Sequence, residues 1–146
     1  MKFKVIVTAA LAVALGVGTA FATGTKEERE AIMKKVGGGM GQLAAIAKGE
    51  KPYDADAVKT ALTAISENAR LFPDQFPAGS ENASPASSPK IWENMDDFKA
   101  RAEKLAGDAD ALLAQLPADQ AGVGAAMKTI GANCGACHQN YRIKTD

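Results

Sequence analysis

Several residue types are scarce in this sequence, and each scarcity narrows the possibilities. The 146 residues include only two cysteines, one histidine and one tryptophan, so Cys and His side chains cannot complete the four-ligand set of a structural zinc site. There is no Asn-Gly or Asp-Gly hairpin signal, and apolar and polar residues do not alternate as they do in half-buried strands. The 17 basic residues balance the 17 acidic ones and form no basic run, which argues against nucleic acid or an anionic membrane as a partner.

The first 22 residues have the features of a secretory signal peptide. Lys2 and Lys4 form a basic start, an apolar run follows over residues 5–17, and small residues precede a cleavage point after Ala22. This apolar run is shorter than the roughly 20 residues of a membrane span, and no second apolar stretch follows. Cleavage would remove two lysines and no acid, which leaves one exported domain, residues 23–146, with a net charge of about −2.

The exported part begins with two stretches of helical periodicity. Thr25 and Glu28 form a capping box that predicts a helix from this point to about residues 48–49. Asp54 is a suitable N-cap for a second helix with apolar residues three and four apart. A break rich in proline and serine then covers residues 72–89.

Two further helices are predicted after this break. Ser88 is the expected cap of a third helix, with Pro89 at its first position, and Pro117 ends it. The fourth helix begins near Ala118 and carries apolar residues on one side as far as Tyr141. Four amphipathic helices without an internal repeat or a domain boundary predict an all-α, antiparallel four-helix bundle.

The most specific signal lies in the last predicted helix. Cys134 and Cys137 are separated by two residues, and His138, the only histidine, follows at once. Cys-x-x-Cys-His is the signature of covalent c-type haem attachment, in which the two thiols meet the two vinyl groups of the porphyrin. On a helix these three side chains share one face, which predicts one haem c with His138 as an axial iron ligand.

Three other functions of a Cys-x-x-Cys pair are alternatives to haem attachment. A thioredoxin-like thiol pair belongs at the start of a helix after a strand, whereas this pair lies near the end of the last helix. A zinc site would need two further ligands, which no other Cys or His can supply. A plain disulfide beside a chance histidine is the third alternative, because an exported protein meets an oxidising compartment.

The residue on the other side of the iron is less determined. With a single histidine, the sixth ligand must be a methionine or a weaker ligand such as lysine, unless the position is empty. Met127 lies on the same helix as His138, eleven residues away or roughly 16 Å along the axis, and therefore cannot reach the opposite haem face. Met95 belongs to another helix, and spacing does not exclude it.

The first predicted helix offers two more candidates. Met33 and Met40 share one apolar stripe and enclose three successive glycines, residues 37–39. Each glycine disfavours a helix by about 1 kcal/mol relative to alanine, which is easier to explain if a flat group approaches the backbone. Met33 near the iron, with Gly37 leaving room for the porphyrin, fits this pattern. Both methionines could equally be core residues, and periodicity alone does not decide between these interpretations.

The chain resembles the four-helix class II c-type cytochromes, which include cytochrome c′ and its low-spin relatives. The resemblance covers nearly all of the exported chain. It rests on Arg29 with Met33, on residues 48–54, on residues 89–92, and above all on residues 134–142, where the attachment motif lies near the C-terminus and is followed by Tyr-Arg.

This resemblance implies a periplasmic protein with the haem inside the bundle. In the cytochrome c′ branch the iron is five-coordinate and high-spin, and its open face binds nitric oxide or carbon monoxide. In the low-spin branch a methionine of the first helix binds the iron and the protein transfers electrons. Met33 matches that position, and the residues around it are closer to the low-spin branch, which predicts His138 and Met33 as iron ligands and an electron carrier rather than an enzyme.

The resemblance also suggests roles for other residues and partners. Arg29 and Arg142 could approach the haem, although each could equally be an arginine that faces solvent. Trp92 could pack on the haem edge but is more simply explained as core. The implied partners are periplasmic redox proteins, with modest electrostatic attraction toward a basic one, and members of the family often form homodimers through the first two helices.

Overall fold

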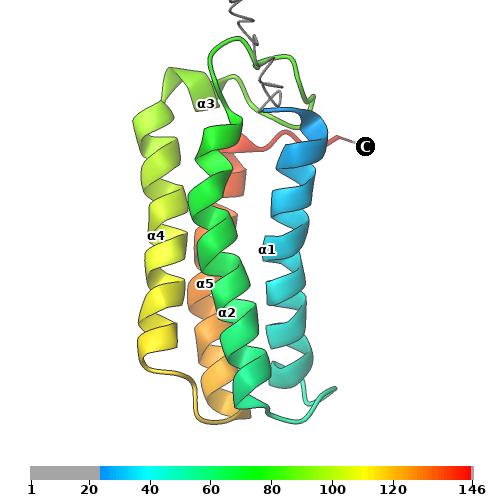
Figure 1. Ribbon diagram of the computed structural model, residues 1–146, viewed down its shortest axis with the longest axis vertical. Coiled ribbons are helices and arrows are strands. Elements are labelled where there is room, and N and C mark those ends of the chain that lie inside the picture. Colours follow the sequence, from blue (N-terminus) through cyan, green and yellow to red (C-terminus); the bar gives the residue numbers. More distant parts are fainter. Residues whose placement is uncertain (1–23, 146) are drawn as a thin grey trace, which may run out of the picture.

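The computed structural model describes residues 24–145, so the predicted signal peptide, residues 1–22, lies outside the described part of the chain. None of the helices within residues 24–145 is long and apolar enough to cross a membrane. The described residues form the predicted antiparallel bundle, in which α1 packs against α2 and α5, and α4 packs against the same two helices (Figure 1).

The first half of the bundle follows the sequence prediction closely. Helix α1 covers Lys26–Ala47, and both hydrogen bonds of the Thr25–Glu28 capping box are present. Helix α2 covers Ala55–Leu71, and the Asp54 side chain accepts hydrogen bonds from two backbone N–H groups of its first turn. A short 3₁₀ helix, η1, covers Phe72–Gln75 and begins the connection to the second half.

The second half corrects the prediction of one long third helix. The backbone of Asn94, at φ −134° and ψ 48°, breaks it into α3, Lys90–Glu93, and α4, Met95–Ala114. The prediction of Ser88 as the cap is wrong, because α3 begins one residue later, at Lys90, and has Pro89 at its N-cap without a side-chain cap hydrogen bond. The Ser88 hydroxyl accepts from the Lys90 N–H at 3.3 Å just before the helix. Helix α5 covers Gln120–Tyr141, with Asp119 as its cap.

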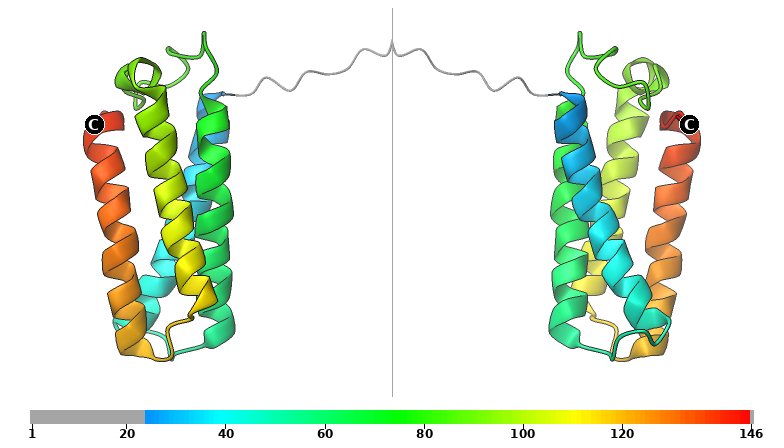
Figure 2. Two further views of the ribbon diagram at one scale, coloured as in Figure 1. Left: turned by 90° about the vertical axis from the view of Figure 1, so that its left-hand side faces the viewer. Right: turned by 90° about the vertical axis from the view of Figure 1, so that its right-hand side faces the viewer.

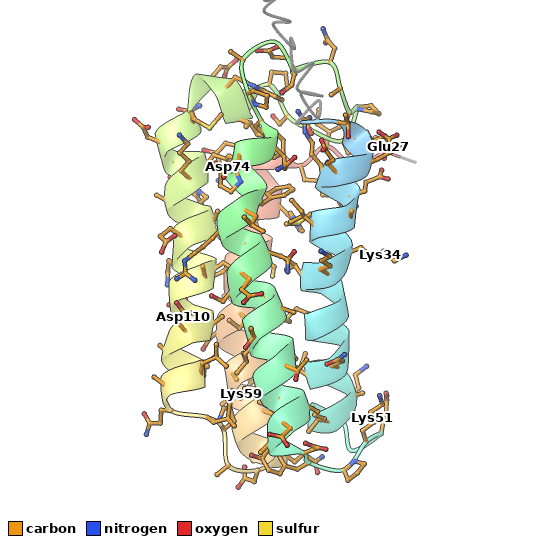
Figure 3. All side chains as sticks on the ribbon, viewed as in Figure 1. Glu27, Lys34, Lys51, Lys59, Asp74 and Asp110 are labelled. Atoms are coloured by element: carbon orange, nitrogen blue, oxygen red, sulfur yellow. The ribbon has the colours of Figure 1, made fainter. Side chains whose placement is uncertain are left out.

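The four long helices do not run strictly parallel to one another. In the two side views, the end of α1 approaches the start of α5, whereas the start of α1 and the end of α5 diverge (Figure 2). Most charged residues lie on the outside, and the side chains of Glu27 and Lys34 point outward (Figure 3). The bundle is therefore widest between α1 and α5 near the C-terminus.

The buried residues form two hydrophobic clusters. The larger one lies along the bundle axis and includes Leu43, Leu62 and Ile130, all fully buried. The smaller one is mainly aromatic and lies near the end of α5. Its buried members are Phe76, Ile91, Phe98 and Tyr141. The remaining space between the clusters adjoins α1 and α5, which places a cavity beside the attachment motif.

One residue of the glycine run is required by helix packing. A Cβ atom on Gly39 would lie 2.7 Å from the carbonyl oxygen of Ala61 and 2.9 Å from Ile65 Cγ1, whereas a Cβ atom on Gly38 would meet nothing within 4 Å. Gly39 thus permits the close approach of α1 to α2. This explanation differs from the haem-based one that the sequence suggested for the run.

Alanine substitutions at Gly39 and Gly38 are therefore expected to have opposite effects on stability. Gly39→Ala is expected to destabilise the protein by about 1–3 kcal/mol, because the new methyl group meets backbone that cannot yield easily. Gly38→Ala is expected to stabilise it by up to about 1 kcal/mol through helix propensity alone. Denaturant unfolding of both variants measures the difference, and equal effects of the two substitutions would contradict this packing role.

Candidate haem-binding site

A cavity of about 610 Å³ opens between α1 and α5. This volume lies within the range of about 300–1,000 Å³ that small-molecule and cofactor pockets occupy. Its wall contains all six residues that the sequence nominated for haem binding. They are Arg29, Met33, Cys134, Cys137, His138 and Arg142. The fold thus brings together, from the two ends of the chain, residues whose proximity the sequence could only suggest.

Helix α5 presents the attachment motif to this cavity. Cys134 packs against the larger hydrophobic cluster and Cys137 against the aromatic one, and neither forms a disulfide. Burial raises the pKa of both thiols above the usual value. Reactive redox cysteines have a lowered pKa instead, so these thiols do not fit a thioredoxin-like pair. Within residues 24–145 the structure shows no group of three or more His, Cys, Asp or Glu side chains placed to hold a metal ion.

His138 lies beside the thiols in the same wall. Its pKa is lowered, first by burial and then by the positive charge of Arg142. A neutral imidazole is the form that binds a metal, because its nitrogen lone pair is then available. The environment of His138 therefore favours the ligand form near neutral pH.

The wall distinguishes among the candidate methionines. Met33 and Met40 both line the cavity from α1, whereas Met95 and Met127 do not belong to its wall. Met95 instead packs against the aromatic cluster and Met127 against the larger one. Gly37 also lines the cavity, and a Cβ atom there would meet nothing within 4 Å of the protein, which agrees with its predicted role of leaving space.

The connection before α3 aligns α1 with α5. The Arg29 Nη1 group donates to the Ser87 hydroxyl at 3.2 Å, and Ser87 forms an antiparallel β-bridge with Arg142. Arg29 and Arg142 therefore adjoin the same residue from opposite sides. Because α1 and α5 are antiparallel, Met33 and His138 each lie four residues, or about 6 Å along the helix axis, further into the bundle than these two arginines. Met40 lies seven residues, or about 10 Å, further down α1.

Arg29 is a buried anchor rather than an arginine that faces solvent. It is only 4 % exposed, and its guanidinium stacks over the Phe76 ring with 4.1 Å between the Cζ atom and the ring centroid. It donates to the carbonyl oxygens of Gln75 and Ser80 at 2.9 and 3.0 Å, and to the hydroxyls of Ser80 and Ser87 at 2.7 and 3.2 Å. Burial lowers the pKa of Arg29, against the attraction of the nearby Glu81. Arg142, in contrast, is exposed.

Sequence reasoning missed two features next to the cavity. The aromatic cluster supplies Phe72, Phe76, Phe98 and Tyr141 to its wall, and these residues come from three separate segments of the sequence. Arg101 of α4 also lines it and pairs with Asp97 one turn earlier. The i,i+4 spacing of Asp97 and Arg101 was the one feature of the sequence that could have indicated this ion pair. Trp92 packs on Phe76 with ring centroids 5.7 Å apart and is not part of the wall, which agrees with its interpretation as core.

The comparisons with known proteins agree with this geometry. The cytochrome c′ family model matches residues 25–142. The chain belongs to this family. A cytochrome c-556 of Agrobacterium fabrum is 62% identical over 144 residues, which cover 99% of this chain and 98% of that protein.

Solved structures support the same assignment. Cytochrome c′ from Rhodopseudomonas palustris matches with a TM-score of 0.78 and 34% identity, over 85% of this chain and 99% of that one. A structural model of oxidised cytochrome c556 from R. palustris matches with a TM-score of 0.73 and 37% identity, over 82% and 96% of the two chains. These findings confirm the predicted family, bundle and haem c cofactor, and they favour the electron-transfer prediction over the gas-binding alternative.

The residues of the cavity fit a covalently attached haem. Two thiols and one imidazole of α5 and two thioethers of α1 line the cavity, and the remaining wall is mostly apolar. Such a set offers two points for thioether attachment and nitrogen and sulfur ligands for iron. Arg29 and Arg142 in the same wall match in charge the carboxylate groups of a haem.

Proposed function

We propose that this protein is a periplasmic electron carrier in which Cys134 and Cys137 hold one haem c and His138 and Met33 are the axial iron ligands. Residues 1–22 would direct its export. The observation that supports the proposal is that Met33 and His138 line one cavity from two antiparallel helices, each four residues from an arginine that contacts Ser87.

The choice of Met33 over Met40 rests on the same alignment. A ligand on the far side of a planar group must face the first ligand across the plane, and a residue two turns lower cannot do so. Met33 would fulfil this requirement, and Met40 would then be a packing residue of the cavity wall. Methionine as the second ligand raises the reduction potential relative to a second nitrogen ligand.

When bound, the haem supplies an iron that alternates between ferric and ferrous states. The chain's own residues determine where and how this happens. The mostly apolar wall would limit the access of water to the haem, and two ligands held by two helices would limit structural change between the states. Of the five N–H groups of Arg29, the bonds described above engage four, so one on Nη1 remains for a haem carboxylate, and Arg142 offers a second cation.

The proposed partners are redox proteins of the periplasm, with which the protein exchanges single electrons without catalysing a reaction of its own. A homodimer through α1 and α2 is also proposed, because family members often pair in this way. The exposed Gly38 and Gly41 of α1 leave room for the close approach of another helix.

Carbon monoxide distinguishes this function from gas binding. An iron with a methionine ligand offers no open position, so the ferrous wild-type protein is expected to show little change of its absorption spectrum under carbon monoxide at neutral pH. A matched sample treated with nitrogen is the control. Rapid and complete conversion to a carbon monoxide complex would instead assign the protein to the gas-binding branch.

A further inference from the structure

An ion pair on α4 contacts the haem-bearing part of α5 at two points. Arg101 Nε and Asp97 Oδ2, one helical turn apart, are separated by 2.6 Å. Arg101 Nη1 donates to the carbonyl oxygen of Ala136 at 3.2 Å, and the Tyr141 hydroxyl donates to Asp97 Oδ2 at 2.5 Å. Ala136 lies inside the attachment motif and Tyr141 one turn beyond it. The two contacts therefore flank the second cysteine and the histidine.

The pair is oriented with its positive end toward the cavity. Arg101 belongs to the cavity wall, and the Asp97 side chain does not. Exposure follows the same order, since the side chain of Arg101 is 32% exposed and that of Asp97 is 49% exposed. A charge beside a mostly apolar cavity acts more strongly on a group inside it than a charge in bulk water does.

The other charges at the cavity come from different elements. Helix α1 contributes three charged residues to the wall, namely the buried Arg29, Glu30 and the exposed Lys34. Glu30 is paired with Lys26 at 3.6 Å. Arg142 follows α5. Among the described residues, Arg101 is the only charged group that α4 contributes to the wall. Substitutions of Arg101 and of its partner Asp97 therefore leave the other charged groups of the wall in place.

We propose that Arg101, held by Asp97, is a positioning residue for the haem-bearing turn of α5 and that its charge raises the reduction potential of the haem. The reason is electrostatic. Reduction lowers the positive charge of the iron site by one, so a nearby cation disfavours the ferric form relative to the ferrous form. This inference rests on the proposed electron-transfer function, and it assigns a role in that function to residues outside the attachment motif.

Four variants of the full holoprotein test the inference through their midpoint potentials. Arg101→Met removes the cation and leaves Asp97 unbalanced, so at a fixed solution potential the ratio of ferrous to ferric protein is expected to fall about three- to tenfold, where tenfold corresponds to about 59 mV. Asp97→Asn removes the more distant negative charge and is expected to raise this ratio, by a smaller factor. Arg101→Lys keeps the charge and is expected to stay near the wild type.

Lys104→Met is the matched control, because Lys104 lies on the same helix in an i,i+4 pair with Asp108 at 2.7 Å. Its side chain is 64% exposed and does not line the cavity, so water and salt screen its charge and the ratio should change less than twofold. The ferric circular dichroism of the haem band is a second readout, since a displaced turn alters it in Arg101→Met and not in Lys104→Met.

Equal potentials for Arg101→Met and Lys104→Met would overturn the electrostatic role. A lowered potential in Asp97→Asn would overturn it as well, and this variant decides the question if Arg101→Met yields no holoprotein, because the amide retains an acceptor for Tyr141. Different measurements would contradict the inference and the proposed function. The wild-type spectrum reports the ligands of the iron, whereas the potential differences among variants report the charges around it.

Discussion

Replacing Met33 by alanine is expected to convert the ferric protein from low-spin to high-spin and to lower its reduction potential by about 60 mV or more. Loss of the thioether leaves the sixth position open, and five-coordinate iron with a single imidazole is high-spin. The potential falls because the thioether favours the ferrous form, and about 60 mV is a tenfold change in the ferrous-to-ferric ratio. The ferrous variant should also bind carbon monoxide readily. Absorption spectra and a redox titration measure these changes.

Met40→Ala is the matched control for this prediction. Met40 is the other methionine in the cavity wall and lies on the same stripe of α1. Its loss removes a similar volume but no iron ligand, so the low-spin spectrum should persist. If Met40→Ala became high-spin and Met33→Ala did not, the alignment of α1 with α5 described above would be wrong.

The largest effect on stability is expected for Arg29→Met. Methionine preserves the apolar stem and its packing but removes all four hydrogen bonds of the guanidinium. The carbonyl oxygens of Gln75 and Ser80 then lose a charged donor in a partly buried place. Such losses typically cost about 2–4 kcal/mol in the free energy of unfolding. Denaturant unfolding of the holoprotein measures the effect.

Lys26→Met serves as the comparison, because Lys26 lies three residues earlier on α1 and makes only an exposed pair with Glu30 at 3.6 Å. A change within about 0.5 kcal/mol is expected there. Similar losses in both variants would mean that the four hydrogen bonds of Arg29 contribute little. In that case Arg29 would not be the anchor that joins α1 to the connection before α3.

Features of the fold that depend on local chemistry could be predicted from the sequence. The caps at Thr25 and Asp54 depend on side chains within three residues of the backbone groups that they bind, so their pattern is visible in the sequence. The attachment motif is local in the same sense. Cys134, Cys137 and His138 share a face because the period of a helix requires it.

Features that depend on contacts between distant segments could not be predicted. The break at Asn94 interrupts a stretch whose apolar spacing is continuous in the sequence. The residues of α3 before the break pack on the aromatic cluster, which is formed by distant segments. Gly39 looked like part of a haem-facing run, but the close approach of α2 explains it. The surroundings of Arg29 come from residues 46–58 positions later in the chain, which no short-range pattern can indicate.

The central claim is that His138 and Met33 both bind the iron, and the visible and far-red absorption spectrum of the ferric wild-type protein tests it most directly. Two strong-field ligands predict sharp low-spin bands together with the weak far-red band of a methionine–iron bond, and reduction should retain the low-spin form. A high-spin ferric spectrum without the far-red band, shifted by added nitric oxide, would contradict the account and show that the sixth position is open.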